Sequence, residues 1–237
     1  MKTIKVGING FGRIGRAFLK IAWDRSEIEI VAVNDLGDIA NMAYLLKYDT
    51  VYRKWNYDIK VEGDSLIIDG KKVRVLAQKD PNALPWKDLE VDVVVESTGL
   101  FTTYEKSKVH LDAGAKKVVI SAPVKNVAEA EALLPPAGGS KASATLGETI
   151  LLGVNEEKFG TCDITSNASC TTNAASPLIA ILDEALGIEK AVLNTVHGYT
   201  ASQSIVDGPN KKDFREGRAA AQNIVPCSTG AAIAVTK

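Results

Sequence analysis

The hydrophobic pattern at the start of the chain predicts a strand, a helix and a second strand. Residues 3–8 form a nearly continuous apolar run, as in a strand covered on both faces. Residues 11–23 then carry apolar side chains at helical spacing, and residues 29–33 form a second apolar run. A strand, helix and strand within so short a stretch form a βαβ unit, whose crossover we expect to be right-handed.

Strands and helices alternate along the rest of the chain. The pattern predicts a helix over 39–48, small antiparallel strands within 57–76, a strand over 91–95, a helix over 104–113 and a strand over 117–120. The pattern then predicts strands at 149–154 and 163–165, a helix from about 170 to 186 and a strand at 191–196. A loop over 198–226 leads to a helix that begins at Ser228. The order predicts an α/β protein with a Rossmann-type, doubly wound parallel sheet, followed by an incomplete α+β domain. Residues 125–148 are rich in Ala, Gly, Ser and Pro; we interpret them as a surface insertion, with a functional lid as the alternative.

Composition and charge narrow the classes of function. The 237 residues contain 28 Lys and Arg against 29 Asp and Glu, and a net charge of −1 argues against a nucleic acid or a membrane surface as partner. No apolar run is long enough to span a bilayer. Three cysteines and two histidines are too few and too scattered for a disulfide framework or a metal cluster. We therefore expect a cytoplasmic protein with reduced thiols and no metal.

A glycine motif in the first βαβ unit predicts a dinucleotide site. The sequence GFGRIG at residues 10–15 fits G-x-G-x-x-G, a pattern that is weak alone but here follows a strand and opens a helix. Gly10 permits a tight turn, and Gly12 lets the backbone approach a pyrophosphate at the helix N-terminus. Asp35 ends the second strand, where a carboxylate accepts hydrogen bonds from ribose hydroxyls and repels a 2′-phosphate. These positions favour NAD over NADP.

One cysteine lies where a helix is predicted to begin. The free N–H groups of a first helical turn stabilise a thiolate, so Cys170 is a candidate nucleophile. His197 follows the predicted strand at 191–196 and is the candidate base. The alternative is that Cys170 is a small buried hydrophobe. His110 lies among charged neighbours on a predicted helix, and we expect it to be solvated.

Hydroxyl groups and arginines gather in the same part of the sequence. They lie at predicted helix starts and in loops, where hydroxyls and backbone N–H groups hold phosphates. For any one of them taken alone, the interpretation as a cap or turn residue is favoured. The set comprises Ser169, Thr171, Thr200, Arg215, Arg218, Ser228, Thr229 and Gly230.

Longer motifs resemble one enzyme family. SNASCTTN at 166–173, HGYTASQ at 197–203 and GRAAAQNIVPCSTGAA at 217–232 resemble phosphorylating glyceraldehyde-3-phosphate dehydrogenase, as do VGINGFGRIGR at 6–16 and ESTGLF at 96–101. The resemblance implies NAD-dependent oxidation of glyceraldehyde 3-phosphate in the presence of inorganic phosphate. In that reaction Cys170 forms a thiohemiacetal and then a thioester, with His197 as base. Residue by residue it implies that NAD is bound by Gly10, Gly12, Arg13, Ile14, Asp35, Lys79, Thr98, Gly99 and Ser121. It implies that phosphate groups are bound by Ser169, Thr171, Thr200, Arg218, Thr229 and Gly230.

The resemblance also implies a domain division and an assembly. Residues 1–169 would form the NAD-binding domain, and residues 170–237 the first part of a catalytic domain. Family members are typically homotetramers and continue well beyond this length, so we expect the chain alone to be poorly active. Two alternatives stay open. One is erythrose-4-phosphate dehydrogenase, and the other is a truncated protein that binds NAD or a partner without catalysis.

Overall fold

A computed structural model describes residues 3–124, 146–211, 213–227 and 229–235. Its internal contacts divide the chain into Met1–Ser169, here unit 1, and Cys170–Lys237, here unit 2. The two units are described separately. Most of the predicted insertion at 125–148, and the predicted helix start at Ser228, lie outside the described residues.

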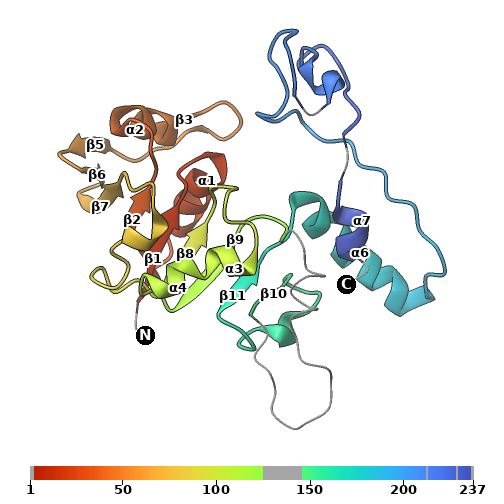
Figure 1. The fold of residues 1–237 in the computed structure, drawn as a ribbon, viewed down its shortest axis with the longest axis horizontal. Coiled ribbons are helices and arrows are strands. Elements are labelled where there is room, and N and C mark those ends of the chain that lie inside the picture. The colour runs from red at the N-terminus through yellow and green to blue at the C-terminus, as the bar shows by residue number, and fades with distance from the viewer. Residues whose placement is uncertain (1–2, 125–145, 212, 228, 236–237) are drawn as a thin grey trace. The chain divides into compact units, whose positions relative to one another are not determined.

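Unit 1 is built on one large sheet (Figure 1). Its described strands follow the order β10-β11-β9-β8-β1-β2-β7-β6-β5. The neighbours from β10 to β7 are parallel, and β5, β6 and β7 form antiparallel pairs at the other end. The strands are β1 (Ile4–Asn9), β2 (Ile28–Asn34), β5 (Ile59–Glu62), β6 (Ser65–Ile68), β7 (Lys71–Leu76), β8 (Val93–Glu96), β9 (Lys117–Ile120), β10 (Glu148–Thr149) and β11 (Ile164–Ser166).

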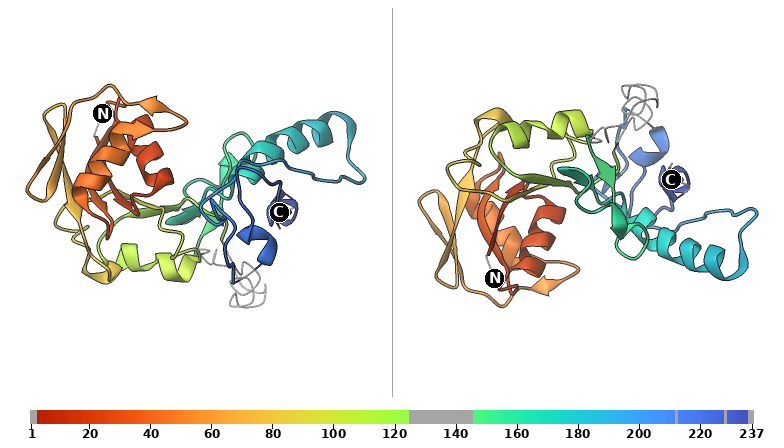
Figure 2. Two further views of the ribbon diagram at one scale, coloured as in Figure 1. Left: turned by 90° about the horizontal axis from the view of Figure 1, so that it is seen from above. Right: turned by 90° about the horizontal axis from the view of Figure 1, so that it is seen from below.

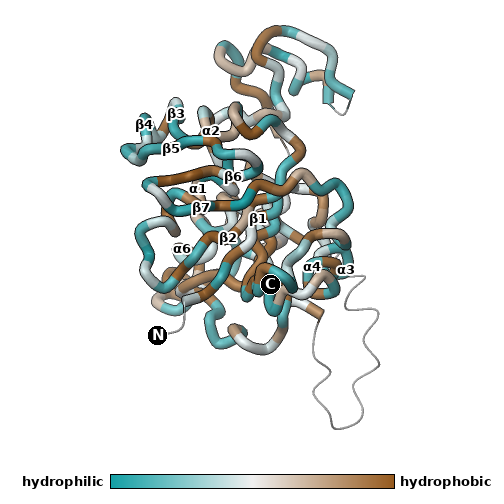
Figure 3. Tube along the Cα trace, turned by 90° about the vertical axis from the view of Figure 1, so that its left-hand side faces the viewer, coloured by the Kyte–Doolittle hydropathy of each residue, from teal (hydrophilic) through white to brown (hydrophobic). Residues whose placement is uncertain are grey.

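Helices cover both faces of this sheet, as the strand pattern predicts. In chain order they are α1 (Arg13–Ala22), α2 (Ile39–Lys47), α3 (Tyr104–Ser107) and α4 (Val109–Asp112). Val95 packs in the cluster that contains Leu19 of α1, whereas its neighbour Val94 packs in the cluster with Trp86. Successive side chains of a strand point to opposite faces, so both faces are buried. Figure 2 shows red α1 and yellow-green α3 and α4 on opposite sides of the strands, and Figure 3 shows the hydrophobic run of β6.

The doubly wound arrangement places a crevice beside β1. From β1 the chain crosses through α1 to β2 on one side, and later returns as β8 on the other side. Where the winding changes direction in this way, the carboxyl ends of the strands leave room for a ligand. Those ends are Asn9, Asn34 and Glu96. The remaining short elements of unit 1 are β3 (Tyr48–Asp49), β4 (Arg53–Lys54), and the 3-10 turns at Pro81–Ala83 and Glu156–Lys158.

Two details of the sequence interpretation of unit 1 are wrong. The predicted strand at 149–154 is reduced to β10, because Gly153 adopts a positive φ of 74° and the Asn155 side chain accepts from the Leu151 N–H at 2.8 Å. These two features bend the segment into turns. The predicted helix over 104–113 is two short helices, α3 and α4, joined at Lys108.

Unit 2 contains one long helix. This long helix is α6 (Cys170–Leu186). The other described elements of unit 2 are the 3-10 turn Phe214–Gly217 and the short helix α7 (Ala231–Val235), which packs against α6. The predicted strand at 191–196 is wrong, because the segment is irregular and Val192 and Val196 are 97% and 88% exposed. A strand needs a neighbour to pair its N–H and C=O groups, and the described part of unit 2 offers none beside this segment.

Candidate functional site

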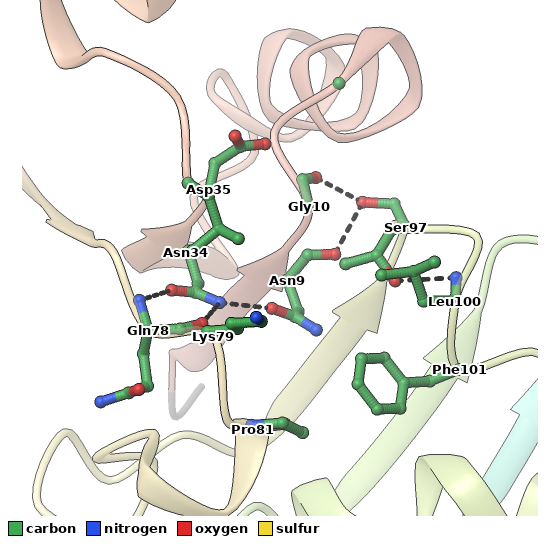
Figure 4. Close-up of a pocket in the computed structure, with 13 residues that line it drawn as sticks. Asn9, Gly10, Asn34, Asp35, Gln78, Lys79, Pro81, Ser97, Leu100 and Phe101 are labelled. Carbon is green, nitrogen blue, oxygen red and sulfur yellow. Dashed lines mark hydrogen bonds between the residues drawn. The ribbon is translucent and has the colours of Figure 1, made fainter.

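A cavity of about 290 Å³ lies at the carboxyl ends of the central strands of unit 1. The ends of β1, β2, β7 and β8 contribute to it, which is the place that the strand order predicts (Figure 4). Asn9, Asn34 and Asp35 supply polar side chains to its lining, and Leu100, Phe101 and Pro81 supply apolar surface. Its lining residues are Asn9, Gly10, Gly12, Asn34, Asp35, Leu36, Gln78, Lys79, Pro81, Ser97, Thr98, Leu100 and Phe101.

The turn after β1 requires glycine for two reasons. Gly10 has a φ of +92°, and a Cβ atom at this position would lie 2.6 Å from the backbone nitrogen of Thr98. The Ser97 hydroxyl donates to the Gly10 carbonyl oxygen at 2.6 Å and holds the turn against β8. Gly12 caps α1 without a side-chain hydrogen bond, and a Cβ there would face open space. The helix N-terminus is therefore open to an anion at the cavity.

Asp35 stands at the rim of this cavity with its carboxylate fixed by the backbone. One oxygen accepts from the Phe11 N–H at 2.7 Å and the other accepts from the Gly37 N–H at 3.0 Å. Figure 4 shows the side chain directed toward the glycine turn. A carboxylate oxygen has a second lone pair, so each remains able to accept from a ligand hydroxyl.

The structure gathers some of the predicted cofactor residues and not others. Gly10, Gly12, Asp35, Lys79 and Thr98 line the cavity. Four further predicted residues, Arg13, Ile14, Gly99 and Ser121, are absent from the described lining. Arg13 pairs with Asp49 at 3.6 Å, and Ile14 is 55% exposed. Gly99 has a φ of +74°, and the Ser121 hydroxyl donates to the Glu96 carbonyl oxygen at 3.0 Å.

Sequence reasoning missed the amides that form the floor of the cavity. Asn9 and Asn34 end β1 and β2, and Gln78 follows β7. One sequence feature could have indicated them, because each of the two buried apolar strands ends in an asparagine. A polar side chain at the carboxyl end of a parallel strand lies at the edge of the sheet where ligands bind.

The prediction for His110 is wrong. Its side chain is fully buried and bonded to Trp86 and Glu96. The charged neighbours that suggested solvent exposure lie on the outer surface of the short helix α4, whereas His110 faces inward.

Cys170 and His197 meet within unit 2. Cys170 is the first residue of α6, and its Sγ lies 3.2 Å from His197 Nε2. His197 Nδ1 lies 2.6 Å from the Gly198 carbonyl oxygen, which can only accept, so Nδ1 carries a proton. Nε2 is then either a base toward the thiol or, once protonated, a donor to the thiolate.

The same contacts shift the acidity of both groups. The hydrogen bond from His197, with help from Thr171, lowers the pKa of Cys170 against the opposing effect of burial. The Gly198 carbonyl and Cys170 raise the pKa of His197. Both shifts favour the thiolate–imidazolium pair, the form in which a cysteine attacks a carbonyl carbon.

The predicted phosphate-binding residues of unit 2 have separate local contacts. Arg218 pairs with Asp207 at 3.1 Å, and these two residues line an open hollow to which Cys170 does not contribute. The Thr200 hydroxyl lies 3.1 Å from that of Ser202. The Thr229 hydroxyl accepts from the Ala231 N–H at 3.2 Å just before α7, and Gly230 lies between them. These contacts are local to each residue, and the assignment of the set to phosphate groups stays a prediction.

Neither a metal cluster nor a membrane-spanning helix occurs among the described residues. They contain no group of His, Cys, Asp and Glu side chains arranged to hold a metal ion. None of the described helices combines the length and apolar character needed to cross a bilayer. Cys162, Cys170 and Cys227 are all free thiols.

Comparisons with known proteins agree on one family. The family model described as "Glyceraldehyde 3-phosphate dehydrogenase, NAD binding domain" matches residues 4–104, and the one described as "Glyceraldehyde 3-phosphate dehydrogenase, C-terminal domain" matches residues 169–237. Glyceraldehyde-3-phosphate dehydrogenase B of Aspergillus oryzae is 47% identical over 236 residues, and glyceraldehyde-3-phosphate dehydrogenase A of Escherichia coli is 48% identical over 235. The matches cover 99% of this chain, which spans 65% of the length of each relative.

Proposed function

Because the chain belongs to the glyceraldehyde-3-phosphate dehydrogenase family, we propose that it carries the cofactor site and the nucleophile of an NAD-dependent, phosphorylating aldehyde dehydrogenase. The substrates would be glyceraldehyde 3-phosphate and inorganic phosphate, and the product 1,3-bisphosphoglycerate. The observation that carries the proposal is the 3.2 Å contact between Cys170 and His197 at the start of α6.

The cavity of unit 1 fits NAD in its chemistry. The open N-terminus of α1 suits a pyrophosphate, and the fixed carboxylate of Asp35 suits the ribose hydroxyls. Lys79 adds a positive charge to the lining. When bound, NAD supplies the acceptor for a hydride from the aldehyde carbon. We further propose that Arg13, Ile14, Gly99 and Ser121 contact the cofactor, as the family resemblance implies.

Cys170 and His197 account for the covalent steps. The Cys170 thiolate adds to the aldehyde carbon while protonated His197 Nε2 gives its proton to the carbonyl oxygen, which forms a thiohemiacetal. Nε2 then takes back that hydroxyl proton as the carbon is oxidised to a thioester. A phosphate oxygen then attacks the thioester carbon and releases the Cys170 thiolate together with the acyl phosphate. The Gly198 carbonyl keeps the Nδ1 proton in place, so that Nε2 is the nitrogen that exchanges protons.

The phosphate groups need cationic and hydroxyl partners. We propose Ser169, Thr171, Thr200, Arg218, Thr229 and Gly230 for this role, on the family resemblance. Arg218 would have to exchange its ion pair with Asp207 for a phosphate, and a bidentate arginine–phosphate contact is a strong replacement. We also propose that the protein acts in the cytoplasm, where exposed thiols such as those of Cys170 and Cys227 stay reduced, and that it assembles as a homotetramer.

A single-turnover assay tests the proposal. The chain, at high concentration with NAD and phosphate, receives glyceraldehyde 3-phosphate, and NADH absorbance is followed. We expect NADH to form with the wild-type chain and not with Cys170→Ser, which keeps the size of the side chain but not the nucleophile. A chain that binds NAD and forms no NADH would contradict the catalytic proposal and favour a non-catalytic NAD-binding protein. A faster reaction with erythrose 4-phosphate would favour the alternative substrate.

A further inference from the structure

A chain of hydrogen bonds runs beneath the cavity of unit 1 and links the ends of four strands. The Gln78 N–H donates to Asn34 Oδ1 at 2.8 Å, Asn34 Nδ2 donates to Asn9 Oδ1 at 2.7 Å, and Asn9 Nδ2 donates to Glu96 Oε2 at 2.6 Å. Figure 4 shows the links among Gln78, Asn34 and Asn9. These three bonds run in one direction and end at Glu96, and Asn34 Nδ2 also donates to the Gln78 carbonyl oxygen at 3.0 Å.

A second chain reaches Glu96 from behind the cavity. The indole N–H of Trp86 can only donate, so His110 Nδ1, at 3.2 Å, must be an acceptor without a proton. The proton of a neutral His110 is therefore on Nε2, which donates to Glu96 Oε2 at 3.0 Å. Trp86 and His110 are completely buried, so this polarity is set inside the protein rather than by solvent.

The other oxygen of Glu96 holds the wall of the cavity. Glu96 Oε1 accepts from the Thr98 N–H at 2.8 Å and from the Thr98 hydroxyl. The Thr98 oxygen in turn accepts from the Leu100 N–H at 3.0 Å. Glu96 is 2% exposed and accepts at both oxygens, the pattern of an ionised carboxylate that donates nothing.

We infer that Glu96, supported by His110 and Trp86, is a positioning residue for the cofactor cavity. Asn9 and Thr98 line the cavity and bond directly to this carboxylate, which fixes which way the Asn9 amide and the Thr98 hydroxyl face. Asn9 in turn accepts from Asn34, whose amide is also held by the Gln78 backbone. The inference rests on the proposed function, because it takes NAD as the ligand of this cavity. Glu96 itself is outside the lining and acts through its neighbours.

Glu96→Gln is the direct test, because glutamine keeps the shape and replaces one acceptor by a donor. Its NH₂ group must oppose either the Thr98 N–H or the pair of donors on Asn9 and His110. We expect the dissociation constant for NAD, measured by calorimetry, to rise about tenfold or more, the range for a lost bond to a charged group. Leu66→Ala is the control, since it removes a buried side chain of β6 that is neither in the network nor in the cavity lining. It should destabilise the chain without weakening NAD binding.

Trp86→Phe provides a milder second variant. It leaves the carboxylate intact and removes the N–H that fixes the tautomer of His110. Nitrogen-15 NMR of the histidine side chains should show a neutral Nε2–H tautomer for His110 in the wild-type chain and a mixture of tautomers in the variant. NAD affinity should fall by a factor of about two to five, less than for Glu96→Gln, since the network is loosened without a donor being reversed.

The outcomes separate this inference from the proposed function. If the wild-type chain binds NAD and Glu96→Gln binds it equally well, or no worse than a Leu66→Ala chain of the same stability, the positioning role is wrong and the proposed function stands. An Nδ1–H tautomer of His110 in the wild-type chain also overturns it, because Nδ1–H would then oppose the Trp86 N–H and Nε2 could no longer donate to Glu96. A wild-type chain that does not bind NAD overturns both the cofactor proposal and the positioning role.

Discussion

Asp35→Asn should weaken the fold and cofactor binding by separate and measurable amounts. The carboxylate accepts from the Phe11 N–H at 2.7 Å and from the Gly37 N–H at 3.0 Å. An asparagine can accept at only one of these positions, and its NH₂ group must then face the other N–H. Gly37 is exposed, so its N–H can turn to water, and the bond to the buried Phe11 loses its charge assistance.

The loss of stability expected for Asp35→Asn follows from these two hydrogen bonds. We expect the free energy of unfolding to fall by about 1–2 kcal/mol, the range for weakening a bond to a charged acceptor. NAD affinity should fall about tenfold because the ribose hydroxyls lose an anionic acceptor. NADP should bind better relative to NAD than in the wild-type chain, since the repulsion between a carboxylate and the 2′-phosphate is gone. Urea titration and calorimetry with each cofactor measure these quantities.

Asp38→Asn is the matched control. Asp38 caps α2 by accepting from the Asn41 N–H at 2.8 Å and does not line the cavity. Asparagine is as good a cap as aspartate, so this variant should bind NAD as the wild-type chain does. If Asp35→Asn leaves both the unfolding free energy and the ratio of NAD to NADP affinity unchanged, the reasoning about the Asp35 carboxylate is refuted.

Three further predictions concern the thiol, the glycine turn and a buried tyrosine. His197 lowers the pKa of Cys170, so iodoacetamide should alkylate Cys170 at lower pH than it alkylates an ordinary thiol. His197→Asn should move the dependence of the alkylation rate on pH to higher pH. Identical pH dependences in the two chains would contradict the contact between Cys170 and His197. Gly10→Ala should lower the free energy of unfolding by about 1–3 kcal/mol and abolish NAD binding. Gly63 also has a positive φ, +58°, but a Cβ there would face open space, so Gly63→Ala should leave NAD binding intact. Equal NAD affinities of the two variants would argue against a close approach of the cofactor to Gly10. Burial raises the pKa of Tyr104 to about 12, so an ultraviolet titration should show one tyrosine that ionises at higher pH than the others. Tyr104→Phe should remove this last ionisation from the titration curve.

The parts that sequence predicted well depend on local chemistry. The strand, glycine turn and helix at residues 4–22 are specified by residues close together in the chain. So are the small antiparallel strands within 57–76, which turn at Gly63 and Gly70 with positive φ. Cys170 at the first turn of α6 is likewise a local feature. Periodicity and turn residues carry this kind of information.

The parts that failed depend on neighbours that are distant in sequence. His110 is buried because Trp86 and Glu96, which lie 24 and 14 residues before it, fold around its ring, and its own helix gives no sign of this. The segment at 191–196 is rich in apolar residues, as a strand is, but it has no described partner beside it. The cavity combines residues at or just after the ends of four strands, and only the assembled sheet brings them together.

The bond between Asn9 and Glu96 joins residues that are 87 positions apart. Closing so long a loop costs entropy before any contact is gained, so we expect β1 and β8 to pair late in folding. The cavity then exists only in chains whose central sheet is complete. A cofactor that binds the native chain alone would add about 2.7 kcal/mol to its stability at a concentration one hundred times the dissociation constant. Cofactor supply would thus govern how long this protein survives proteolysis in the cell.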